Sequence, residues 1–262
     1  MSASTIGGIN LLPDHEKREI YRRVIPHELL ERFKLNPYLT DKNGNSLIAL
    51  KCKVGSTSVE LSLYHEHGFR DPILYGHLTD TMNGQIHILL YVLNDPTSPR
   101  FDVDVMPDGE PTKFGTFRRN VDAEQNALAF GLAPGQIRSG LGLLTAATTA
   151  FEKFVESLGH EMYFVEPLYY HNAIIFERYG FSYQVGKKLM ERIQAEFTGD
   201  TDISRQLVDS TSPFRQPEAK NSIRLRSWAI HDGILGEPFT NVTMYKRIGK
   251  NAGISTSENC TW

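Results

Sequence analysis

The sequence predicts an α+β fold in which helices flank a mixed, mostly antiparallel central sheet. Apolar runs bounded by turn residues are typical of strands, and the first half of the chain has them at residues 46–52, 58–64, 73–79 and 85–93. The last two runs are joined through Asn83-Gly84, the strongest short hairpin signal. Residues 141–158 instead carry apolar side chains three and four positions apart, which indicates an amphipathic helix. Hairpins followed by a helix-containing half predict the α+β class.

The remaining elements follow from the same periodicities. Two short helices are predicted before the first strand, at residues 14–24 and 26–35. A short strand is expected between two Pro-rich loops, at residues 101–106. Beyond the long helix, the pattern predicts strands at 160–166, 223–230 and 241–248, and helices at 172–179 and 184–197.

The domain organisation is predicted to be one domain with additions. Residues 1–57 form an N-terminal helical and strand extension, and residues 58–250 form the main domain. A polar, Pro-containing stretch within about residues 184–222 is expected to be an insertion, and residues 251–262 a flexible tail. Two tandem half-domains are the alternative.

Composition excludes several function classes. The chain of 262 residues is 40% hydrophobic and 23% charged with a net charge of −3, so it lacks the basic footprint of a nucleic-acid binder. No apolar run approaches the roughly 18 residues that span a bilayer, and the first residues are not typical of a secretory signal. Cys52 and Cys260 form neither a disulfide framework nor a zinc motif. We therefore expect a cytoplasmic protein without nucleic-acid or membrane partners.

The stretch from residue 127 to residue 142 is the most informative segment. Residues 127–132 are expected to form a strand that stops at Ala133-Pro134, and a turn then leads into the helix that begins near residue 141. The first N–H groups of a helix have no intrahelical partner and lie at the positive end of its dipole, so such a turn suits a phosphate. Gly140 and Gly142 would let a bulky anion approach the main chain. The turn is not a P-loop, because no Gly-Lys-Ser/Thr follows.

Two motifs in this order resemble the GNAT superfamily of acyl-CoA-dependent N-acyltransferases. The family's cofactor turn, Pro-x-x-Gln/Arg-x-x-Gly-x-Gly/Ala, is matched from Pro134 through Arg138 to Gly140-Leu141-Gly142. Its later signature, an aromatic residue followed by Glu-Lys/Arg-x-Gly-Phe, is matched by residues 176–181. The resemblance covers roughly residues 72–183, and residues 241–248 resemble the family's closing strand.

The resemblance implies a direct acyl transfer from acetyl-CoA or another acyl-CoA, as cosubstrate, to a small-molecule or protein amine. It implies no metal and leaves a homodimer open. The end of the cofactor strand, which splays from the next strand, would offer its free backbone groups to the pantetheine. The implied cofactor-binding residues are Leu132, Ala133, Ile137, Arg138, Ser139, Gly140, Leu141, Gly142, Asn172 and Phe176.

The chain departs from the family pattern at two positions. Ile137 stands where the family has Gln or Arg, which should weaken pyrophosphate binding. Phe176 occupies the position at which the family often has a tyrosine that protonates the departing thiolate. Tyr179 is therefore the candidate acid, and a packing role for Tyr179 is the alternative. A thiol with a pKa near 8.5 can also leave without an acid. The alternative is a non-catalytic acyl-CoA-binding or regulatory module.

The candidate base is Glu124, just before the expected cofactor strand, with a pKa raised by partial burial; a solvated glutamate is the alternative. Asn172 either holds the pantetheine or caps its helix. His231 beside Asp232 is a weaker base candidate, since adjacent residues seldom face each other.

The histidines of the N-terminal half raise the alternative of a metal site. With Asn83-Gly84 as a two-residue turn, His87 is expected opposite Asp80 and His77 opposite Leu90, which puts the two histidines on opposite faces. That pairing excludes a four-histidine site and leaves a two-histidine site at His65 and His67 as an alternative.

Overall fold

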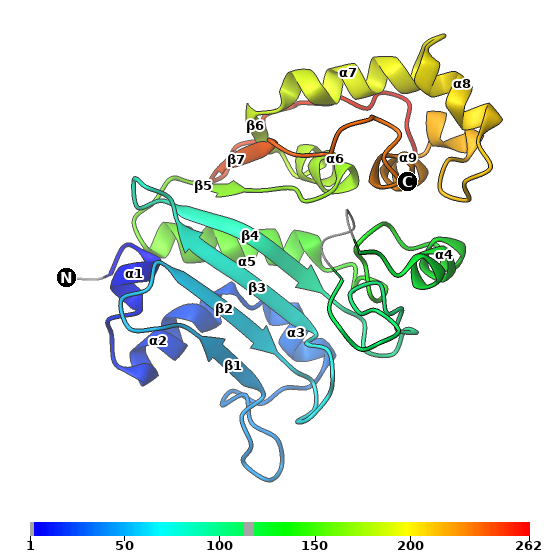
Figure 1. The fold of residues 1–262 in the computed structure, drawn as a ribbon. Helices are drawn as coiled ribbons and strands as arrows, with labels where there is room; N and C mark the ends of the chain where they lie inside the picture. Colours follow the sequence, from blue (N-terminus) through cyan, green and yellow to red (C-terminus); the bar gives the residue numbers. More distant parts are fainter. Residues whose placement is uncertain (1–2, 113–117) are drawn as a thin grey trace. The chain divides into compact units, whose positions relative to one another are not determined.

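The computed structural model describes residues 3–112 and 118–262 and confirms the α+β class with a mostly antiparallel sheet. Within the described residues the strands follow one another in the sheet in the order β1-β2-β3-β4-β5-β7-β6 (Figure 1). They are β1 (Ile48–Lys51), β2 (Ser58–Leu63), β3 (Leu74–Asp80), β4 (Ile86–Leu93), β5 (Met162–Val165), β6 (Ser182–Val185) and β7 (Thr243–Arg247). The helices are α1 (Ile6–Ile9), α2 (Asp14–Tyr21), η1 (Arg22–Val24), α3 (His27–Arg32), α4 (Val121–Phe130), α5 (Leu144–Ser157), α6 (Tyr170–Arg178), α7 (Lys187–Thr198), α8 (Asp202–Asp209), η2 (Pro217–Lys220) and α9 (Ile223–His231).

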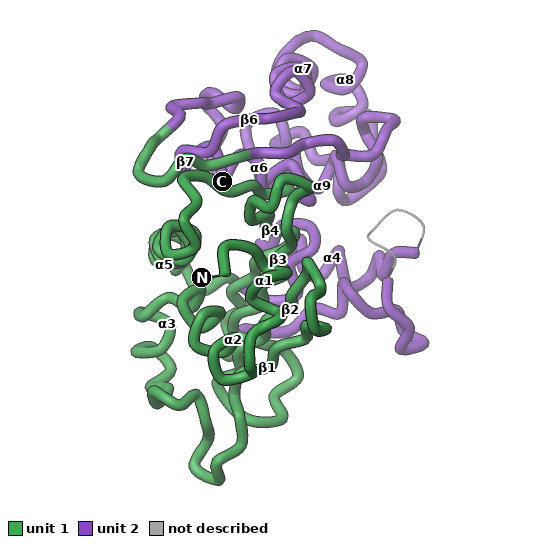
Figure 2. The backbone as a smooth tube through the Cα atoms, turned by 90° about the vertical axis from the view of Figure 1, so that its left-hand side faces the viewer, with its two compact units in different colours: residues 1–97, 140–166, 245–251 green, residues 98–139, 167–244, 252–262 purple. Residues whose placement is uncertain are grey.

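The chain divides into two compact units, each assembled from separate segments (Figure 2). Unit 1 contains residues 1–97, 140–166 and 245–251, and unit 2 contains residues 98–139, 167–244 and 252–262. The residues expected to form an N-terminal extension lie in unit 1, where β1 pairs with β2. Both units are interrupted in the sequence.

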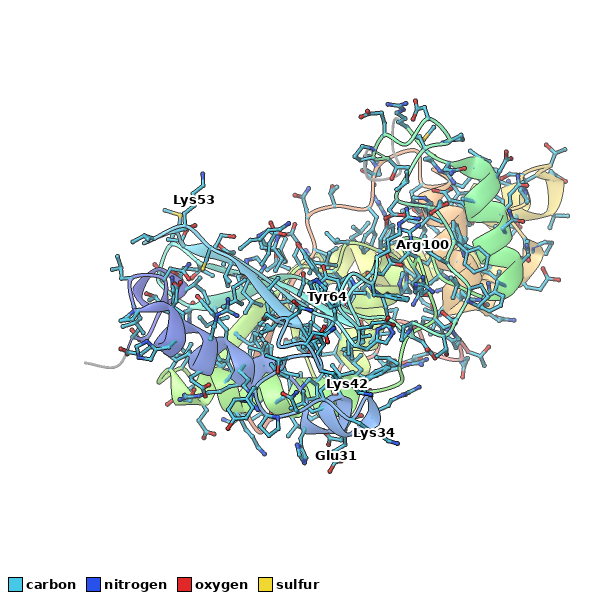
Figure 3. All side chains as sticks on the ribbon, turned by 90° about the horizontal axis from the view of Figure 1, so that it is seen from below. Glu31, Lys34, Lys42, Lys53, Tyr64 and Arg100 are labelled. Atoms are coloured by element: carbon cyan, nitrogen blue, oxygen red, sulfur yellow. The ribbon has the colours of Figure 1, made fainter. Side chains whose placement is uncertain are left out.

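Unit 1 is built on the antiparallel strands β1 to β4, with β5 parallel to β4. Helices α1, α2, α3 and α5 cover one face of these strands (Figure 1). The alternating burial of β2 directs Val59, Leu61 and Leu63 into this core, where Phe154 of α5 is also fully buried. Charged side chains such as Lys34, Lys42 and Lys53 project outward (Figure 3).

The β3–β4 hairpin corrects the expected histidine geometry. The turn is wider than two residues, because Thr81 N–H donates to Gln85 O at 2.8 Å, and His87 therefore lies opposite Thr79. A β-bulge then restores the expected pairing of His77 with Leu90. His77 and Thr79 point to the same side of β3, so His77 and His87 share a face. The prediction that they lie on opposite faces was wrong.

Unit 2 overturns the strand predicted at residues 127–132, because that stretch is the end of helix α4 and the loop after it. Asn120 caps the helix by accepting the Ala123 N–H at 3.3 Å, and Asp122 and Glu124 lie in its first turn. Gly131 ends it with a φ of 99°. The alanines of this stretch favour a helix, and this preference outweighs the strand signal of the short apolar run.

The strand predicted at residues 223–230 is likewise wrong, because these residues form helix α9. The alternation from Ile223 to Arg226 imitates a strand, but Ser222 caps a helix by accepting the Leu225 N–H at 3.3 Å. Arg226 and Trp228 are fully buried, so most of the helix surface is covered and the simple amphipathic pattern is absent. Residues 101–106 contain no strand either; Val105 forms only an isolated bridge with Pro111.

The remaining predicted elements agree with the structure, with bounds shifted by a few residues. Strand β6, helices α1 and α8 and the 3-10 helix η2 were not predicted, and α8 and η2 lie inside the expected insertion. The expected flexible tail is hydrogen-bonded within unit 2: Thr256 donates through N–H and Oγ1 to the buried Glu177 carboxylate, and Thr261 N–H donates to Asn221 O. No helix among the described residues is both long enough and apolar enough to cross a membrane.

Candidate functional site

Strands β4 and β5 of unit 1 part soon after they meet. Their parallel ladder pairs His87 with Phe164 and Ile88 with Val165, and β5 then ends while β4 continues to Leu93. The β-bulge in β4 lies between Ile88 and Leu90, at the point of parting. Past the bulge, the edge of β4 that faced β5 has no β5 partner, so this is the splayed pair that the sequence led us to expect elsewhere.

The backbone of Tyr91 is turned toward this splayed edge. Asn94 N–H donates to Ile73 O at 3.0 Å, which fixes the residues of β4 that hydrogen-bond toward β3. Because backbone groups alternate along an antiparallel strand, Leu90 and Val92 point toward β3 and Tyr91 points away from it. The Tyr91 side chain lies on the helix-covered face, where its hydroxyl donates to Val24 O at 3.3 Å. Its N–H and C=O are therefore held in place at the edge.

Residues 140–142, which we call the glycine loop, lie directly beyond the end of β4. Gly140 forms an isolated antiparallel bridge with Asn94, and helix α5 begins at Leu144. Gly140 and Gly142 are exposed, whereas Leu141 between them is buried and anchors the loop. Gly142 has a φ of 69°, which a side chain would strain, and no side chain caps the N-terminus of α5. The loop therefore leads into an uncapped helix start, as the sequence predicts for an anion-binding turn, but the strand before it in space is β4 and not residues 127–132.

Arg32 is a functional candidate that sequence reasoning missed. It is the last residue of α3, and its Nη1 donates to Leu141 O at 2.8 Å. Its Nη2 lies 3.8 Å from the Asp95 carboxylate, just after β4. The guanidinium therefore fixes the glycine loop and places a positive charge beside it. Nothing in the sequence near Arg32 points to this contact, because the two residues are more than a hundred positions apart.

A cavity of about 730 Å³ lies in unit 1 beside the first turns of α5. Two cationic side chains, Arg23 and Lys153, line it together with His27, against one carboxylate, Glu28. Arg23 is held in position by donating to Ser157 Oγ at 3.1 Å. The other lining residues are Ile25, Gly142, Leu143, Thr145, Ala146, Thr149 and Ala150. The lining thus favours an anionic ligand.

Leu132 and Ala133, expected to offer a strand edge to the cofactor, do not do so. Both are buried in unit 2, in the loop after α4. Leu132 O accepts the indole N–H of Trp228 at 2.8 Å, and Ala133 N–H donates to Gln136 Oε1 at 2.7 Å. Their backbone groups are satisfied within unit 2, so their assignment to the pantetheine loses its basis.

The residues between this loop and Gly140 are tied to the start of unit 2. Ile137 O accepts the Phe101 N–H at 2.9 Å. Arg138 Nη1 donates to Ser98 O at 2.5 Å, and Ser139 N–H donates to Ser98 Oγ at 3.1 Å. The backbone or side chains of these three predicted cofactor residues are therefore engaged within unit 2, by Ser98 and Phe101.

The predicted residues of the second motif belong to helix α6. Asn172 is not the N-cap residue of this helix, because Tyr169 holds that position; the Asn172 side chain lies in the first turn and accepts the N–H of Tyr169 at 3.2 Å, as the third helical residue of a capping box does. The ring of Phe176 packs 5.0 Å from that of Phe181. Tyr179 is half-buried at the end of the helix and does not line the cavity of unit 2.

Glu124 is buried rather than solvated, and it lies within an ionic network of unit 2. His231 Nε2 is 3.0 Å from its Oε1, while Arg119 Nε and Nη2 donate to its Oε2 at 2.8 and 2.5 Å. Burial alone would raise the pKa of Glu124, but the hydrogen bonds from His231 and Arg119 outweigh it and lower the pKa. The expected upward shift was therefore wrong, and Glu124 is a carboxylate that orients its partners.

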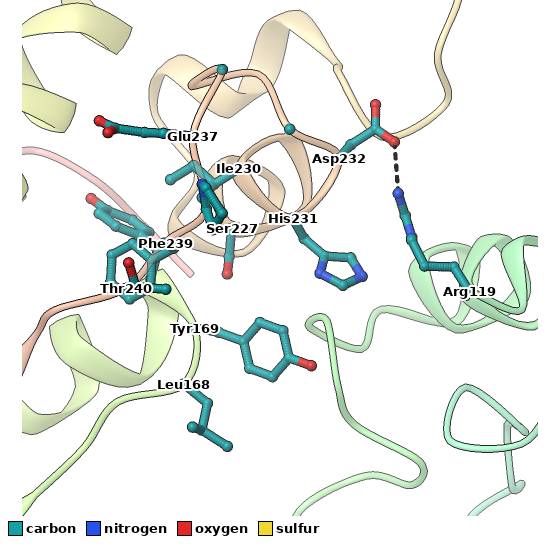
Figure 4. Close-up of a pocket in the computed structure, with 14 residues that line it drawn as sticks. Arg119, Leu168, Tyr169, Ser227, Ile230, His231, Asp232, Glu237, Phe239 and Thr240 are labelled. Carbon is teal, nitrogen blue, oxygen red and sulfur yellow. Dashed lines mark hydrogen bonds and ion pairs between the residues drawn. The ribbon is translucent and has the colours of Figure 1, made fainter. Parts of the chain in front are cut away.

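A cavity of about 620 Å³ lies beside this network in unit 2 (Figure 4). His231 and Tyr169 both project into the same space, with ring centroids 5.6 Å apart. Gly135 makes room for Tyr169, since a Cβ at this position would lie 2.4 Å from its Cε2. The lining residues are Arg119, Leu168, Tyr169, Tyr170, Ser227, Ile230, His231, Asp232, Gly233, Gly236, Glu237, Pro238, Phe239 and Thr240.

Ser227 and His171 also meet beside this cavity but do not form a nucleophilic pair. Asn172 Oδ1 is fixed by Tyr169 N–H, so its Nδ2 faces His171 Nε2 at 3.2 Å and requires that nitrogen to accept. His171 Nδ1 then carries the proton and donates to Ser227 Oγ at 2.9 Å. Burial lowers the pKa of His171 to about 3, and His231 adds to the effect. The pair is a neutral structural contact.

Among the described residues, no group of three or more His, Cys, Asp or Glu side chains is placed to hold a metal ion. Comparison with known proteins gave no match to a family model, to a curated protein or to a solved structure. The site is therefore interpreted from its own geometry.

Proposed function

We propose that the chain is an acyl-CoA-dependent N-acyltransferase whose cofactor binds to unit 1. The observation that carries the proposal is the parting of β4 from β5 after Ile88 and Val165, with the glycine loop and the start of α5 directly beyond β4. This supplies a strand edge and an anion-binding turn in the order in which pantetheine and pyrophosphate follow each other in coenzyme A. The GNAT resemblance of the sequence points to the same class.

The pantetheine arm is proposed to bind along the splayed edge of β4. An extended amide-containing chain can hydrogen-bond to an open strand edge as an added strand does. The N–H and C=O of Tyr91 are directed to this edge. The ladder between β3 and β4, on the opposite edge of β4, keeps this part of the strand in place. A backbone N–H at this edge also suits the thioester oxygen, on which negative charge develops during attack by an amine.

The phosphates are proposed to bind at the loop from Gly140 to Gly142 and the N-terminus of α5. The exposed glycines permit close approach, and the helix dipole favours a negative group. Arg32 adds a cation that is already fixed to Leu141 O. The nearby cavity with Arg23 and Lys153 suits the 3′-phosphate of the adenosine moiety.

The thiolate can leave without Tyr179, because a thiol pKa near 8.5 makes it a tolerable leaving group. Phe176 packs against Phe181, and a phenylalanine has no proton to donate. It also favours the alternative of a non-catalytic acyl-CoA-binding module. Release of free thiol with an amine panel distinguishes the two functions.

Calorimetric titration with acetyl-CoA and CoA tests the proposal. Gly140→Asp should abolish binding, because it puts a carboxylate where the phosphates bind; its Cβ would meet only Leu93 O, at 3.7 Å, so the fold tolerates it. Gly140→Asn is the matched control of equal size and should bind more tightly than the Asp variant. An absence of binding by the wild-type chain at millimolar ligand would refute the proposal, as would equal affinity in all three proteins.

A further inference from the structure

We propose that the cavity of unit 2 binds a neutral aromatic carbonyl compound, whose carbonyl oxygen accepts a hydrogen bond from the Ser227 hydroxyl. The cavity of about 620 Å³ is lined by α9, by the chain that leads into α6 and by residues 233–240. Every residue that the proposal uses lies in unit 2. The proposal therefore stands whether or not unit 1 binds coenzyme A.

Ser227 has a hydroxyl proton that no group in the described part of the chain accepts. The proton of the neutral His171 ring is on Nδ1, because Asn172 Nδ2 donates to Nε2, and His171 Nδ1 donates to Ser227 Oγ at 2.9 Å. The His171 backbone N–H reaches the same oxygen at 3.4 Å. Ser227 is thus the acceptor in both contacts, and the residue is only 1% exposed. Since a buried donor without a partner is costly, a ligand oxygen that accepts this proton would gain a strong contact.

The Ser227 donor faces the cavity. Ser227 belongs to the lining, and its oxygen is directed toward the space that Tyr169 borders (Figure 4). Ile230 lies three positions further along α9, on the same helix face, and also lines the cavity. An acceptor oxygen at Ser227 and an apolar group against Ile230 can therefore be parts of one small molecule.

The charged side chains at the α9 end of the cavity are already paired within unit 2. Arg119 donates through Nε and Nη2 to Glu124, and through Nη1 to Asp232 at 3.1 Å. Asp232 also accepts from Arg215 Nε at 2.8 Å. Two guanidinium groups thus balance two carboxylates. Neither an anion nor a cation finds an uncompensated opposite charge here.

Two further lining residues carry or can carry a charge, and both are engaged. Glu237, which is exposed, forms an ion pair with Arg192. His231 is hydrogen-bonded through Nε2 to Glu124 at 3.0 Å. A charged ligand would lose part of its hydration without gaining a free counter-ion, which is unfavourable. The lining therefore favours a neutral ligand.

The walls favour an aromatic body on that ligand. Three aromatic rings belong to the lining, and three aliphatic side chains add apolar surface. The rings are those of Tyr169, Tyr170 and Phe239, and the aliphatic side chains are those of Leu168, Ile230 and Pro238. Aromatic side chains favour stacked or edge-to-face contacts with a further ring. The volume is in the range that small organic ligands occupy.

Titration of the full chain with acetophenone, followed by NMR at the Trp228 indole N–H, tests the proposal. This group donates to Leu132 O at 2.8 Å, and the Trp228 ring centroid lies 5.7 Å from that of His231, so an aromatic ring bound in the cavity should shift its resonance. Trp262→Phe identifies the resonance, because the chain has two tryptophans. Benzoate and 1-phenylethylammonium resemble acetophenone in shape but carry a negative and a positive charge. Acetophenone should bind about tenfold more tightly than either.

Ser227→Ala tests the hydrogen bond to the carbonyl oxygen. The substitution should weaken acetophenone binding about threefold to tenfold. Isopropylbenzene has a similar shape but no acceptor, so its affinity should not fall. The comparison of two ligands in one variant separates loss of the hydrogen bond from a general disturbance of the cavity, such as loss of the acceptor for His171.

Leu168→Asp is a second variant that leaves Ser227 and the buried core unchanged. Leu168 lines the cavity and is 39% exposed, so an aspartate there puts an unpaired carboxylate into an apolar wall. It should weaken acetophenone binding about tenfold. Val185→Asp is the matched control and should have no effect, because Val185 lies on β6, is 52% exposed and is outside the lining.

Three results would overturn the inference. The first is an unchanged Trp228 resonance with acetophenone at millimolar concentration. The second is binding of benzoate or of 1-phenylethylammonium as tightly as acetophenone. The third is an equal loss of affinity for acetophenone and isopropylbenzene in Ser227→Ala. If Ser227→Ala does not fold, the second pair of variants decides, since equal affinities in Leu168→Asp and Val185→Asp would place the ligand outside this cavity.

Discussion

Replacing Gly135 by alanine tests the geometry of the unit 2 cavity most sharply. The new Cβ would lie 2.4 Å from Tyr169 Cε2 and 2.7 Å from both Cζ and the hydroxyl oxygen. The backbone φ of 80° adds a cost of about 1–2 kcal/mol for any residue with a Cβ. Displacing the packed ring costs about 1–3 kcal/mol more. We expect a total loss of about 2–5 kcal/mol in the free energy of unfolding.

A double-mutant cycle separates these two costs. Tyr169→Leu lacks all three clashing atoms, so in that background Gly135→Ala should cost only the backbone term. Gly131→Ala is the matched control, because its φ is 99° and a Cβ there meets nothing within 4 Å. Urea unfolding followed by tryptophan fluorescence gives the four free energies. A coupling energy within about 0.5 kcal/mol of zero would show that Gly135 does not make room for Tyr169.

Three further predictions concern pH and the phosphates. The pKa of His171 is about 3 in the fold against about 6.5 when unfolded, so the unfolded chain binds more protons in this window and stability falls as pH is lowered. Between pH 7 and 4.5 His171 should cost about 2.5 kcal/mol, and His171→Gln should flatten the pH dependence of urea unfolding; an equally steep curve contradicts this. Arg32→Gln should weaken CoA binding about tenfold in calorimetry, and Arg18→Gln, which removes an exposed charge of α2, should not. Equal effects of the two substitutions would show that CoA affinity depends on net charge and not on the position of Arg32. Lys153→Met should weaken binding of CoA but not of dephospho-CoA, and an equal loss for both would place the 3′-phosphate elsewhere.

The sequence predicted the elements whose local and tertiary signals agree. The hairpin of β3 and β4 and the amphipathic α5 carry clear periodicities, and Gly140 to Gly142 lie at the start of α5 as expected. Residues 127–132 failed because a short apolar run was weighed above the Asn120 cap and the helix-favouring alanines. That error assigned the cofactor edge to Leu132, whereas the structure has the splayed edge on β4.

The rest of the candidate sites depends on contacts that no local pattern encodes. Arg32 reaches Leu141, and His231 reaches Glu124, each across more than a hundred residues. His231 was set aside because Asp232, its neighbour, does not face it; its actual partner comes from α4. Glu124 was singled out as a base with a raised pKa, but its pKa is lowered, because the hydrogen bonds from His231 and Arg119 outweigh the effect of burial.

Amide hydrogen exchange of unit 1, measured with and without saturating CoA, tests whether coenzyme A lies along the splayed edge of β4 as we propose. We expect CoA to slow exchange at the Tyr91 amide, which points to that edge, and to leave Leu90 and Val92 unchanged, because β3 already protects their amides. Gly142 and the first amides of α5 should slow as well. CoA binding that leaves Tyr91 exchange unaltered would contradict the claim.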